Sequence, residues 1–405
     1  MTSLSPTQRL PAIDLARGIA LLGVALVNVH AFAAVWSTVY GLDLAKSSAD
    51  VVAEYVNAVL FTHRSYPVLA FLFGVGLAWQ WQRLPEHAQR PNALRPRLWA
   101  LLLIGIAHGL LLWPGEVLTV YAVLGLVLVT VLRLNDRVVL GVAITVYVGT
   151  TVMYTGIAAS WLVWPGAPVP VVEPAPSFEL SSIRAALVLR RQEFLDRGLM
   201  QLLVPDFWAH VLLGMWAGRS GALARFLRDP VGNQGVVTLG ALLLAFGTTL
   251  EIIAAQHGGW DALVTQDLGV ALMAIALVWA SLGGLWLWLT IAALWVRYDS
   301  GSVKNGALKS LITAAGRAPL TQFIGQSIIF AVLFNKSLIG LHGELGRGMY
   351  SLIALATYLL LCAFLRAWFA SGHPHGPMEI VWRRLTNLLS PQRRPRSAER
   401  LTSEP

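Results

Sequence analysis

The chain has 405 residues, of which 56% are hydrophobic and only 13% are charged, and its mean hydropathy is +0.63. Soluble domains carry about 25% charged residues, so this composition excludes an ordinary soluble protein and predicts an all-α polytopic membrane protein. The formal net charge of +9 does not indicate nucleic-acid binding, because the basic residues are scattered between apolar segments and fit the positive-inside rule.

Apolar runs long enough to cross a bilayer recur along the chain. We expect about ten transmembrane helices, near residues 15–36, 56–80, 97–113, 117–134, 138–164, 200–218, 235–255, 267–296, 314–334 and 349–370. The eighth is longer than a bilayer requires and contains Gly283-Gly284, which favours a tilt or a kink. Residues 1–389 are predicted to form a single transmembrane domain, followed by a disordered basic tail at 390–405.

The charges between the apolar runs predict the orientation. Arginine and lysine gather after the second, fourth, sixth and eighth runs and in the C-terminal tail. The connection after the first run is acidic instead, with Asp43, Asp50 and Glu54. By the positive-inside rule, both termini are expected in the cytoplasm.

The longest connection, residues 165–199, is then expected outside the cytoplasm. It begins with dense proline, which favours an extended path, and residues 180–197 are amphipathic enough for a helix on the outer membrane surface. Two interpretations remain open for this segment, a solvated connector or a lid over an outward-facing site.

The first apolar run combines polar groups with a length that crosses the bilayer. Asp14 and Arg17 are three residues apart, so an ion pair can form on one helix face. Asn28 and His30 lie near the other end, and the 13 residues from Arg17 to His30 span roughly 20 Å of helix axis. The first helix is therefore predicted to connect the two sides of the membrane.

Four separated stretches combine small and polar residues. They are Asp14-Leu-Ala-Arg17-Gly18 with Gly23 and Asn28; Gly105-Ile-Ala-His108 with Gly115-Glu116 and Tyr121; Gly316-Arg317-Ala-Pro-Leu-Thr321-Gln322 with Gln326; and Gly376-Pro-Met-Glu379 with Trp382-Arg383. In this order they resemble the YeiB-like family of bacterial inner-membrane proteins (domain of unknown function 418). The family pattern usually has aspartate where Glu116 stands and asparagine where Gln322 stands.

The YeiB-like family is distantly similar to transmembrane acyltransferases of the heparan-glucosaminide N-acetyltransferase type. This resemblance implies a multi-pass protein of the bacterial inner membrane, with acyl-coenzyme A (acyl-CoA) as the cytosolic co-substrate and an envelope glycan or lipid as the acceptor. No bound cofactor is expected. Those enzymes use an essential histidine, and His30, His63 and His108 are all candidates for it here.

His108 with Glu116 is the leading catalytic hypothesis, and His30 is a second candidate. A carboxylate one short turn away can orient an imidazole that acts as a base or carries the acyl group. The alternative is a histidine tied to a carbonyl, with Glu116 capping the next helix. Arg17 is the expected donor-binding residue, and further substrate-binding candidates are Asn28, His63, Arg64, Tyr121, Asp206, His210, Gln322 and Gln326.

Each of these candidates also has a structural interpretation. A neutral imidazole packed between helices is the more common fate of a histidine such as His30, and glutamines often form ordinary helix–helix hydrogen bonds. The single cysteine, Cys362, and the absence of a His-x-x-x-His spacing argue against a metal site. A transporter or exporter is the alternative function, and a non-catalytic scaffold is the third. The sequence does not indicate the oligomeric state.

Overall fold

The computed structural model describes residues 10–33, 47–84, 90–163, 176–256, 268–298 and 303–390. These residues form helices joined by turns, and no strand occurs among them. Six of the described helices are long and apolar enough to cross a membrane, or up to eight spans if each of two bent helix pairs counts as one. The all-α class is therefore confirmed for this part of the chain. The proline-rich start of the 165–199 connection and the 391–405 tail lie outside the described residues.

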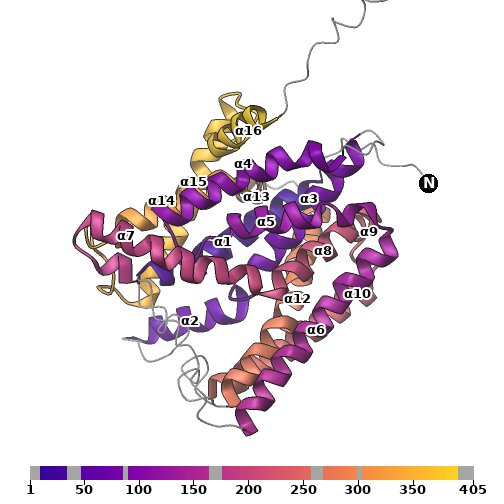
Figure 1. Ribbon diagram of the computed structural model, residues 1–405, viewed down its shortest axis with the longest axis horizontal. Helices are drawn as coiled ribbons and strands as arrows, with labels where there is room; N and C mark the ends of the chain where they lie inside the picture. The colour runs from indigo at the N-terminus through magenta and orange to yellow at the C-terminus, as the bar shows by residue number, and fades with distance from the viewer. Residues whose placement is uncertain are drawn as a thin grey trace, which may run out of the picture.

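Figure 1 shows the arrangement of the helices. The N-terminal half contains α1 (Pro11–Ala33), α2 (Ser48–Leu60), α3 (Tyr66–Arg83), α4 (Arg90–Leu111), α5 (Leu118–Leu128), η3 (Val131–Arg133), α6 (Asp136–Val163), η4 (Pro176–Glu179) and α7 (Ile183–Glu193). It is followed by η5 (Phe194–Gly198), η6 (Leu199–Leu203), α8 (Pro205–Arg219), α9 (Ala222–Arg228), α10 (Gln234–Gln256), α12 (Leu268–Arg297), α13 (Val303–Arg317), α14 (Pro319–Phe334), α15 (Arg347–Ala370) and α16 (Pro377–Leu389).

Helix α1 occupies the middle of the molecule and contacts α2, α3, α12, α13, α14 and α15 (Figure 1). Its closest neighbour is α13, because glycines bring the two backbones into contact. A Cβ atom at Gly18 would lie 2.1 Å from the Ile312 carbonyl oxygen, and one at Gly316 would lie 1.7 Å from the Asp14 carbonyl oxygen. From α15, the Tyr358 hydroxyl donates a 2.8 Å hydrogen bond to the Gly18 carbonyl. The lone cysteine, Cys362, is buried one turn further along α15.

The predicted 56–80 run is divided in the structure into α2 and α3. The turn at residues 61–65 separates them, and His63 there has a positive φ of 56°. A left-handed residue cannot continue a right-handed helix. Pro67 in the first turn of α3 then fits the restart, because the first N–H groups of a helix need no intrahelical acceptor.

The predicted 314–334 run is also interrupted, since α13 and α14 meet at an angle of 91°. Proline at position 319 disfavours the helical conformation of the residue before it, and Ala318 has φ −128° and ψ 62°. In contrast, α12 continues as one helix through Gly283-Gly284. A Cβ at Gly283 would lie 2.3 Å from the Leu244 backbone nitrogen, so this glycine is needed for close packing on α10.

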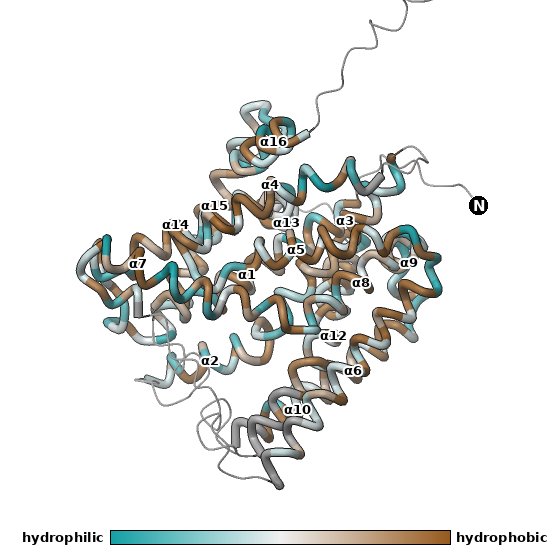
Figure 2. The backbone as a smooth tube through the Cα atoms, viewed as in Figure 1, coloured by the Kyte–Doolittle hydropathy of each residue, from teal (hydrophilic) through white to brown (hydrophobic). Residues whose placement is uncertain are grey.

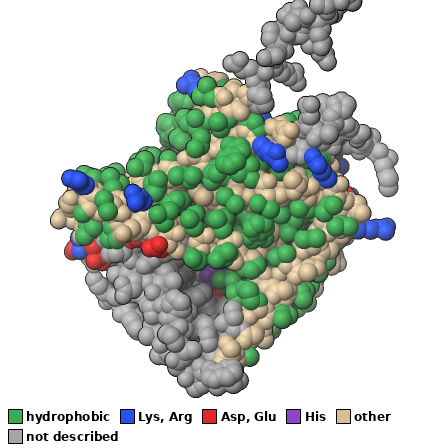
Figure 3. Space-filling model, in the orientation of Figure 1, with side chains coloured by type: hydrophobic (Ala, Val, Ile, Leu, Met, Phe, Trp, Pro, Cys, Tyr) green, Lys and Arg blue, Asp and Glu red, His purple; other side chains and the backbone are tan. Residues whose placement is uncertain are grey.

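The surface of the bundle is apolar where soluble proteins are polar. Helices α6 and α10 expose many large side chains, among them Val152 (65%) and Leu242 (62%), and both helices are largely hydrophobic in Figure 2. Apolar side chains spread over the visible face in Figure 3, and lysine and arginine lie mostly toward its edges. An apolar band with basic ends matches a lipid bilayer as the surrounding medium.

The contact between α1 and α13 predicts a sharp difference between two glycine substitutions. Gly316→Ala should lower the free energy of unfolding by about 1–3 kcal/mol, because the methyl group has no space and overpacking strains the helices. Gly149→Ala on α6 is the matched control, since a Cβ there meets nothing within 4 Å. Thermal unfolding of the purified protein in detergent measures both changes. Equal melting temperatures for the two variants would contradict the packing described here.

Candidate functional site

His108 and Glu116 lie together at the junction of α4 and α5. The His108 Nδ1 atom is 3.7 Å from a Glu116 carboxylate oxygen, and both side chains are buried. Glu116 accepts hydrogen bonds from the backbone N–H groups of Leu118 and Thr119 (2.6 Å to Thr119), so it also caps α5. Neither ring nitrogen of His108 has a hydrogen-bond partner among the described residues. Catalytic contacts are often long in ligand-free structures, so this geometry suits an imidazole that is oriented but not fully satisfied.

Glycine allows the two helices to approach at this pair. A Cβ at Gly105 would lie 2.6 Å from the Thr119 backbone nitrogen and 2.8 Å from the Glu116 carboxylate. The His108 ring also lies 5.2 Å, centroid to centroid, from Phe323 of α14. The imidazole therefore lies between α4, α5 and α14.

The segment from η4 to η6 covers the end of α4. Arg190 of α7 donates a 2.7 Å hydrogen bond to the Leu111 carbonyl, and its guanidinium lies 4.5 Å from the centre of the Phe178 ring. Phe194 lies directly against α4, because a Cβ at Gly109 would be 2.4 Å from its ring. An orphan carbonyl at the end of α4 is thereby satisfied by the covering segment.

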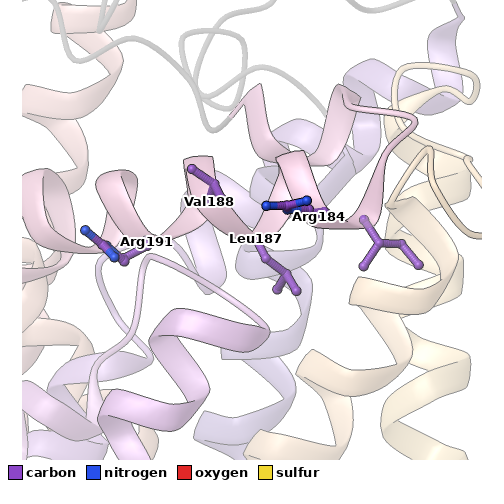
Figure 4. A pocket seen from close by; sticks show the side chains of 5 residues that line it. Arg184, Leu187, Val188 and Arg191 are labelled. Carbon is purple, nitrogen blue, oxygen red and sulfur yellow. The ribbon is translucent and has the colours of Figure 1, made fainter.

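Helix α7 also has an exposed face with mixed character. The prediction of an amphipathic helix in residues 180–197 is confirmed over Ile183–Glu193. Ile183 and Val188 are 52% and 61% exposed. A surface cavity of about 540 Å³ along this face is lined by Ile183, Arg184, Leu187, Val188 and Arg191 (Figure 4). Apolar and cationic side chains side by side suit a helix at a membrane surface.

Asp206 of α8 is the centre of a second buried cluster. Its carboxylate accepts hydrogen bonds from the Tyr66 hydroxyl and from Ser281 (3.3 Å). The His210 Nδ1 atom lies 3.1 Å from the same carboxylate and 2.8 Å from the Asp206 carbonyl oxygen. Asp206 and His210, which the sequence suggested separately as substrate-binding candidates, are therefore partners. Tyr66 and Ser281 were not predicted.

Arg64 instead pairs with Glu251, a residue that the sequence interpretation missed. The Arg64 side chain is fully buried, and it donates to the Glu251 carboxylate, to Thr248 (2.8 Å) and to backbone carbonyl oxygens. His63 approaches the same carboxylate at 3.5 Å. The sequence did offer a signal for Glu251, because it is a lone carboxylate in the apolar helix α10. Such a charge requires a partner inside a membrane.

Tyr121 lies between the first two clusters. Its hydroxyl is 3.5 Å from the Tyr66 carbonyl oxygen, and the carboxylates of Glu116 and Asp206 are both within electrostatic reach. Five of the predicted site residues therefore form one buried polar region: His108, Glu116, Tyr121, Asp206 and His210.

The other candidates lie elsewhere. The His30 Nε2 atom is 2.9 Å from the Asn57 amide and 3.4 Å from the Ser351 hydroxyl. These groups belong to α2 and α15, whereas Asn28 is only half-buried. His30 is therefore packed between helices and away from Glu116.

Gln322 and Gln326 of α14 connect helices. Gln322 donates to the Tyr358 carbonyl at 3.2 Å, and Gln326 donates to the Leu21 carbonyl at 3.3 Å. These bonds match the structural interpretation of the two glutamines. Arg17 lies at the start of α1, 3.6 Å from Asp14, with a quarter of its side chain exposed.

Glu379 explains why the third and fourth stretches occur together. It accepts hydrogen bonds from the backbone of Leu320 (2.8 Å) and from the Thr321 hydroxyl (2.6 Å), and so caps the start of α14. Burial raises the pKa of Glu379, and the hydrogen bonds from Thr321 and the backbone act in the opposite direction. Gly376 is required here, since its Cβ would lie 2.6 Å from the Ala318 side chain.

The fold and these clusters define a class, the multi-pass α-helical membrane proteins with titratable side chains buried between helices. Residues 217–388 match the family "Protein of unknown function (DUF418)", and the third and fourth stretches lie inside that match. Together with the relatives described next, this match confirms the resemblance to the YeiB-like DUF418 family that the four stretches predicted.

Relatives align over nearly the whole chain. It is 26% identical to the uncharacterized protein YxaH of Bacillus subtilis (strain 168) over 417 residues, which cover 96% of this chain and 97% of YxaH. It is 24% identical to the uncharacterized protein YeiB of Escherichia coli (strain K12) over 421 residues, 94% of this chain and 96% of YeiB. An uncharacterized 39.9 kDa protein in the amylase 3′ region of Bacillus acidopullulyticus is 32% identical over 139 residues, 34% of this chain and 38% of that protein.

The Arg64–Glu251 pair predicts strong destabilisation when either partner is removed. Arg64→Leu leaves a carboxylate between helices, and Glu251→Gln leaves a buried guanidinium, so each should cost about 3–5 kcal/mol of unfolding free energy. The double variant should recover part of that loss, because no unpaired charge remains. Chemical denaturation of all three variants tests the coupling. Strictly additive losses would show that the two groups do not act as a pair.

Proposed function

We propose that this protein is a transmembrane acyltransferase that moves an acyl group from cytosolic acyl-CoA to a glycan or lipid of the cell envelope. The observation that carries the proposal is the buried His108–Glu116 pair, in which a carboxylate held by two backbone N–H groups lies beside a histidine with unsatisfied nitrogens. This is the relation between base and orienting group that acyl transfer requires.

In this proposal His108 removes the proton from an acceptor hydroxyl or amine. The freed electron pair forms a bond to the acyl carbonyl carbon, the carbon–sulfur bond to coenzyme A breaks, and the departing thiolate takes up the proton. Glu116 is the positioning residue that fixes the imidazole and stabilises its protonated form. The segment from η4 to η6 serves as the lid that keeps water from the acyl group.

The orientation is part of the proposal. Basic helix ends meet at one end of the molecule, where Arg219 contacts the carbonyl oxygens of Leu132 and Leu134 and the Asp136 carboxylate. We place this end, the start of α1 and both termini in the cytoplasm of a bacterial cell, with the bundle in its inner membrane. Arg17 then faces the side from which acyl-CoA arrives. The same proposal keeps ten spans, counting α3 and α5 among them.

Transport is the second candidate, and the break between α13 and α14 favours it. Secondary transporters use discontinuous helices near the middle of the membrane, and α13 and α14 meet at 91°. The buried carboxylates of Asp206 and Glu251 are the groups that a proton- or ion-coupled pathway would use.

A donor assay separates the two functions. Purified protein in nanodiscs is incubated with a panel of labelled acyl-CoA donors, and coenzyme A release and protein labelling are followed. His108→Ala should lower turnover by about 10²–10⁴-fold, the usual loss of a general base. His373→Ala is the control, because His373 is exposed and stacked on Trp368.

If His108 is not the catalytic histidine, parallel variants identify the residue that is: His30→Ala, His63→Ala and His210→Ala. Loss of turnover in His210→Ala alone would move the catalytic centre to the Asp206 cluster. No coenzyme A release or label transfer with any donor would reject acyl transfer in favour of transport, which a substrate-uptake assay in proteoliposomes then measures.

The proposal also predicts a pH profile. Burial raises the pKa of Glu116 from 4.5 to about 7, against the effect of hydrogen bonds from Thr119 and Leu118. Glu116 is therefore protonated below that pH, and turnover should rise as the pH increases through about 7. Because the pKa is raised in the folded chain, the stability that depends on this group should fall from pH 4.5 to about 7. Both dependences should disappear in Glu116→Gln, and an unchanged profile in that variant would remove Glu116 from the mechanism.

A further inference from the structure

A second cavity lies at the start of α1. It has a volume of about 550 Å³ and is formed by α13, the end of α15 and the first residue of α1, Pro11. Along α13, the residues Lys309, Thr313 and Arg317 are spaced by four, which places them on one helix face. Arg366 and Phe369 of α15 form the facing wall.

The lining of this cavity is cationic. Lys309, Arg317 and Arg366 supply three positive charges, and Ser310 and Thr313 add hydroxyl groups. None of the described lining residues is acidic. The Arg317 guanidinium lies 3.9 Å from the centre of the Phe369 ring, so an aromatic face holds its plane in place. Such preorganisation reduces the entropy that binding would cost.

We propose that this cavity is a binding site for a phosphate group. Guanidinium groups bind phosphate oxygens through paired hydrogen bonds, and a lysine adds a compact charge. Hydroxyl groups can donate to the remaining oxygens. The start of α1 lies at the same cavity, and the positive end of its helix dipole also favours an anion. The cationic lining and the start of α1 therefore both attract the negative charge of the phosphate.

The volume admits more than a bare ion. Small-molecule sites range from about 300 to 1,000 Å³, so a phosphate with part of its organic substituent fits. Two sources share this chemistry, the headgroup of an anionic phospholipid at the membrane surface and a soluble phosphorylated compound such as coenzyme A. The inference does not depend on acyl transfer, because it concerns recognition of the phosphate group alone.

Binding measurements on the full-length protein test the site in two arms. In the soluble arm, pyrophosphate and coenzyme A are titrated into protein held in phosphatidylcholine nanodiscs. In the lipid arm, native mass spectrometry counts phosphatidate retained by protein taken from mixed phosphatidate and phosphatidylcholine vesicles. We expect Arg366→Gln to weaken binding by about tenfold in whichever arm shows it, the loss typical of a charge-assisted hydrogen bond.

Two further variants make the result specific. Gly306→Leu should also weaken binding, by filling the cavity without changing charge, since a Cβ at Gly306 meets nothing within 4 Å and the fold can accept it. Lys336→Gln removes an exposed positive charge at the far end of α14 and should leave binding unchanged. The absence of binding in both arms would overturn the proposal, as would equal losses in Arg366→Gln and Lys336→Gln. Binding without acyl transfer would reject the acyltransferase proposal and leave the phosphate site standing.

Discussion

The close contact between the backbones of α1 and α13 is the constraint on which the rest of the structure depends. With no side chain at Gly18 or Gly316, the two helices lie nearer than any other residue type would permit. That spacing brings α14 and α15 within reach of α1, where Gln326 and Tyr358 donate to its carbonyl oxygens. A helix that crosses the whole bundle is thus held by backbone contacts and by hydrogen bonds to its own carbonyl groups.

The second constraint is that every buried charge needs a partner. The structure satisfies its carboxylates in three different ways. Glu116 and Glu379 accept from the starts of helices, Asp206 accepts from hydroxyl groups, and Glu251 pairs with an arginine. At the Glu116 site and at the Asp206 site, a histidine lies beside the carboxylate. The carboxylate engages that histidine only partly. Polar groups in an apolar bundle cost free energy unless they are paired, so incomplete satisfaction at these two places is the strongest physical argument for a role in chemistry.

Composition and hydropathy were sufficient to predict the helical class and the approximate position of the apolar helices. The divisions within those helices were harder to predict. The bend between α13 and α14 was not predicted, although Pro319 marks it, because the apolar run continues across the proline and hydropathy alone does not register a change of direction. The break before α3 was not predicted either, because residues 61–65 contain no proline or glycine and Pro67, the available signal, lies in the first turn of the helix that follows.

The sequence indicated the residues of the candidate site better than it indicated which of those residues pair with one another. The short turn between His108 and Glu116 made that pair accessible from the sequence, since the two residues are eight positions apart. Arg64 and Glu251 are 187 positions apart, and no local pattern connects them. The same limit applies to Tyr66 and Ser281 around Asp206, because partner choice across helices depends on packing that a single sequence does not encode locally.

Because Cys362 is buried, the reactivity of its thiol indicates whether the helix bundle is intact. It is the only thiol in the sequence, and its side chain is fully enclosed beside Tyr358 on the α15 face that meets α1. A thiol reagent can modify the protein only after α15 separates from its neighbours. The rate of that modification therefore measures how often the helix interface opens, without any introduced label, and it distinguishes variants that alter the bundle from those that alter only the chemistry inside it.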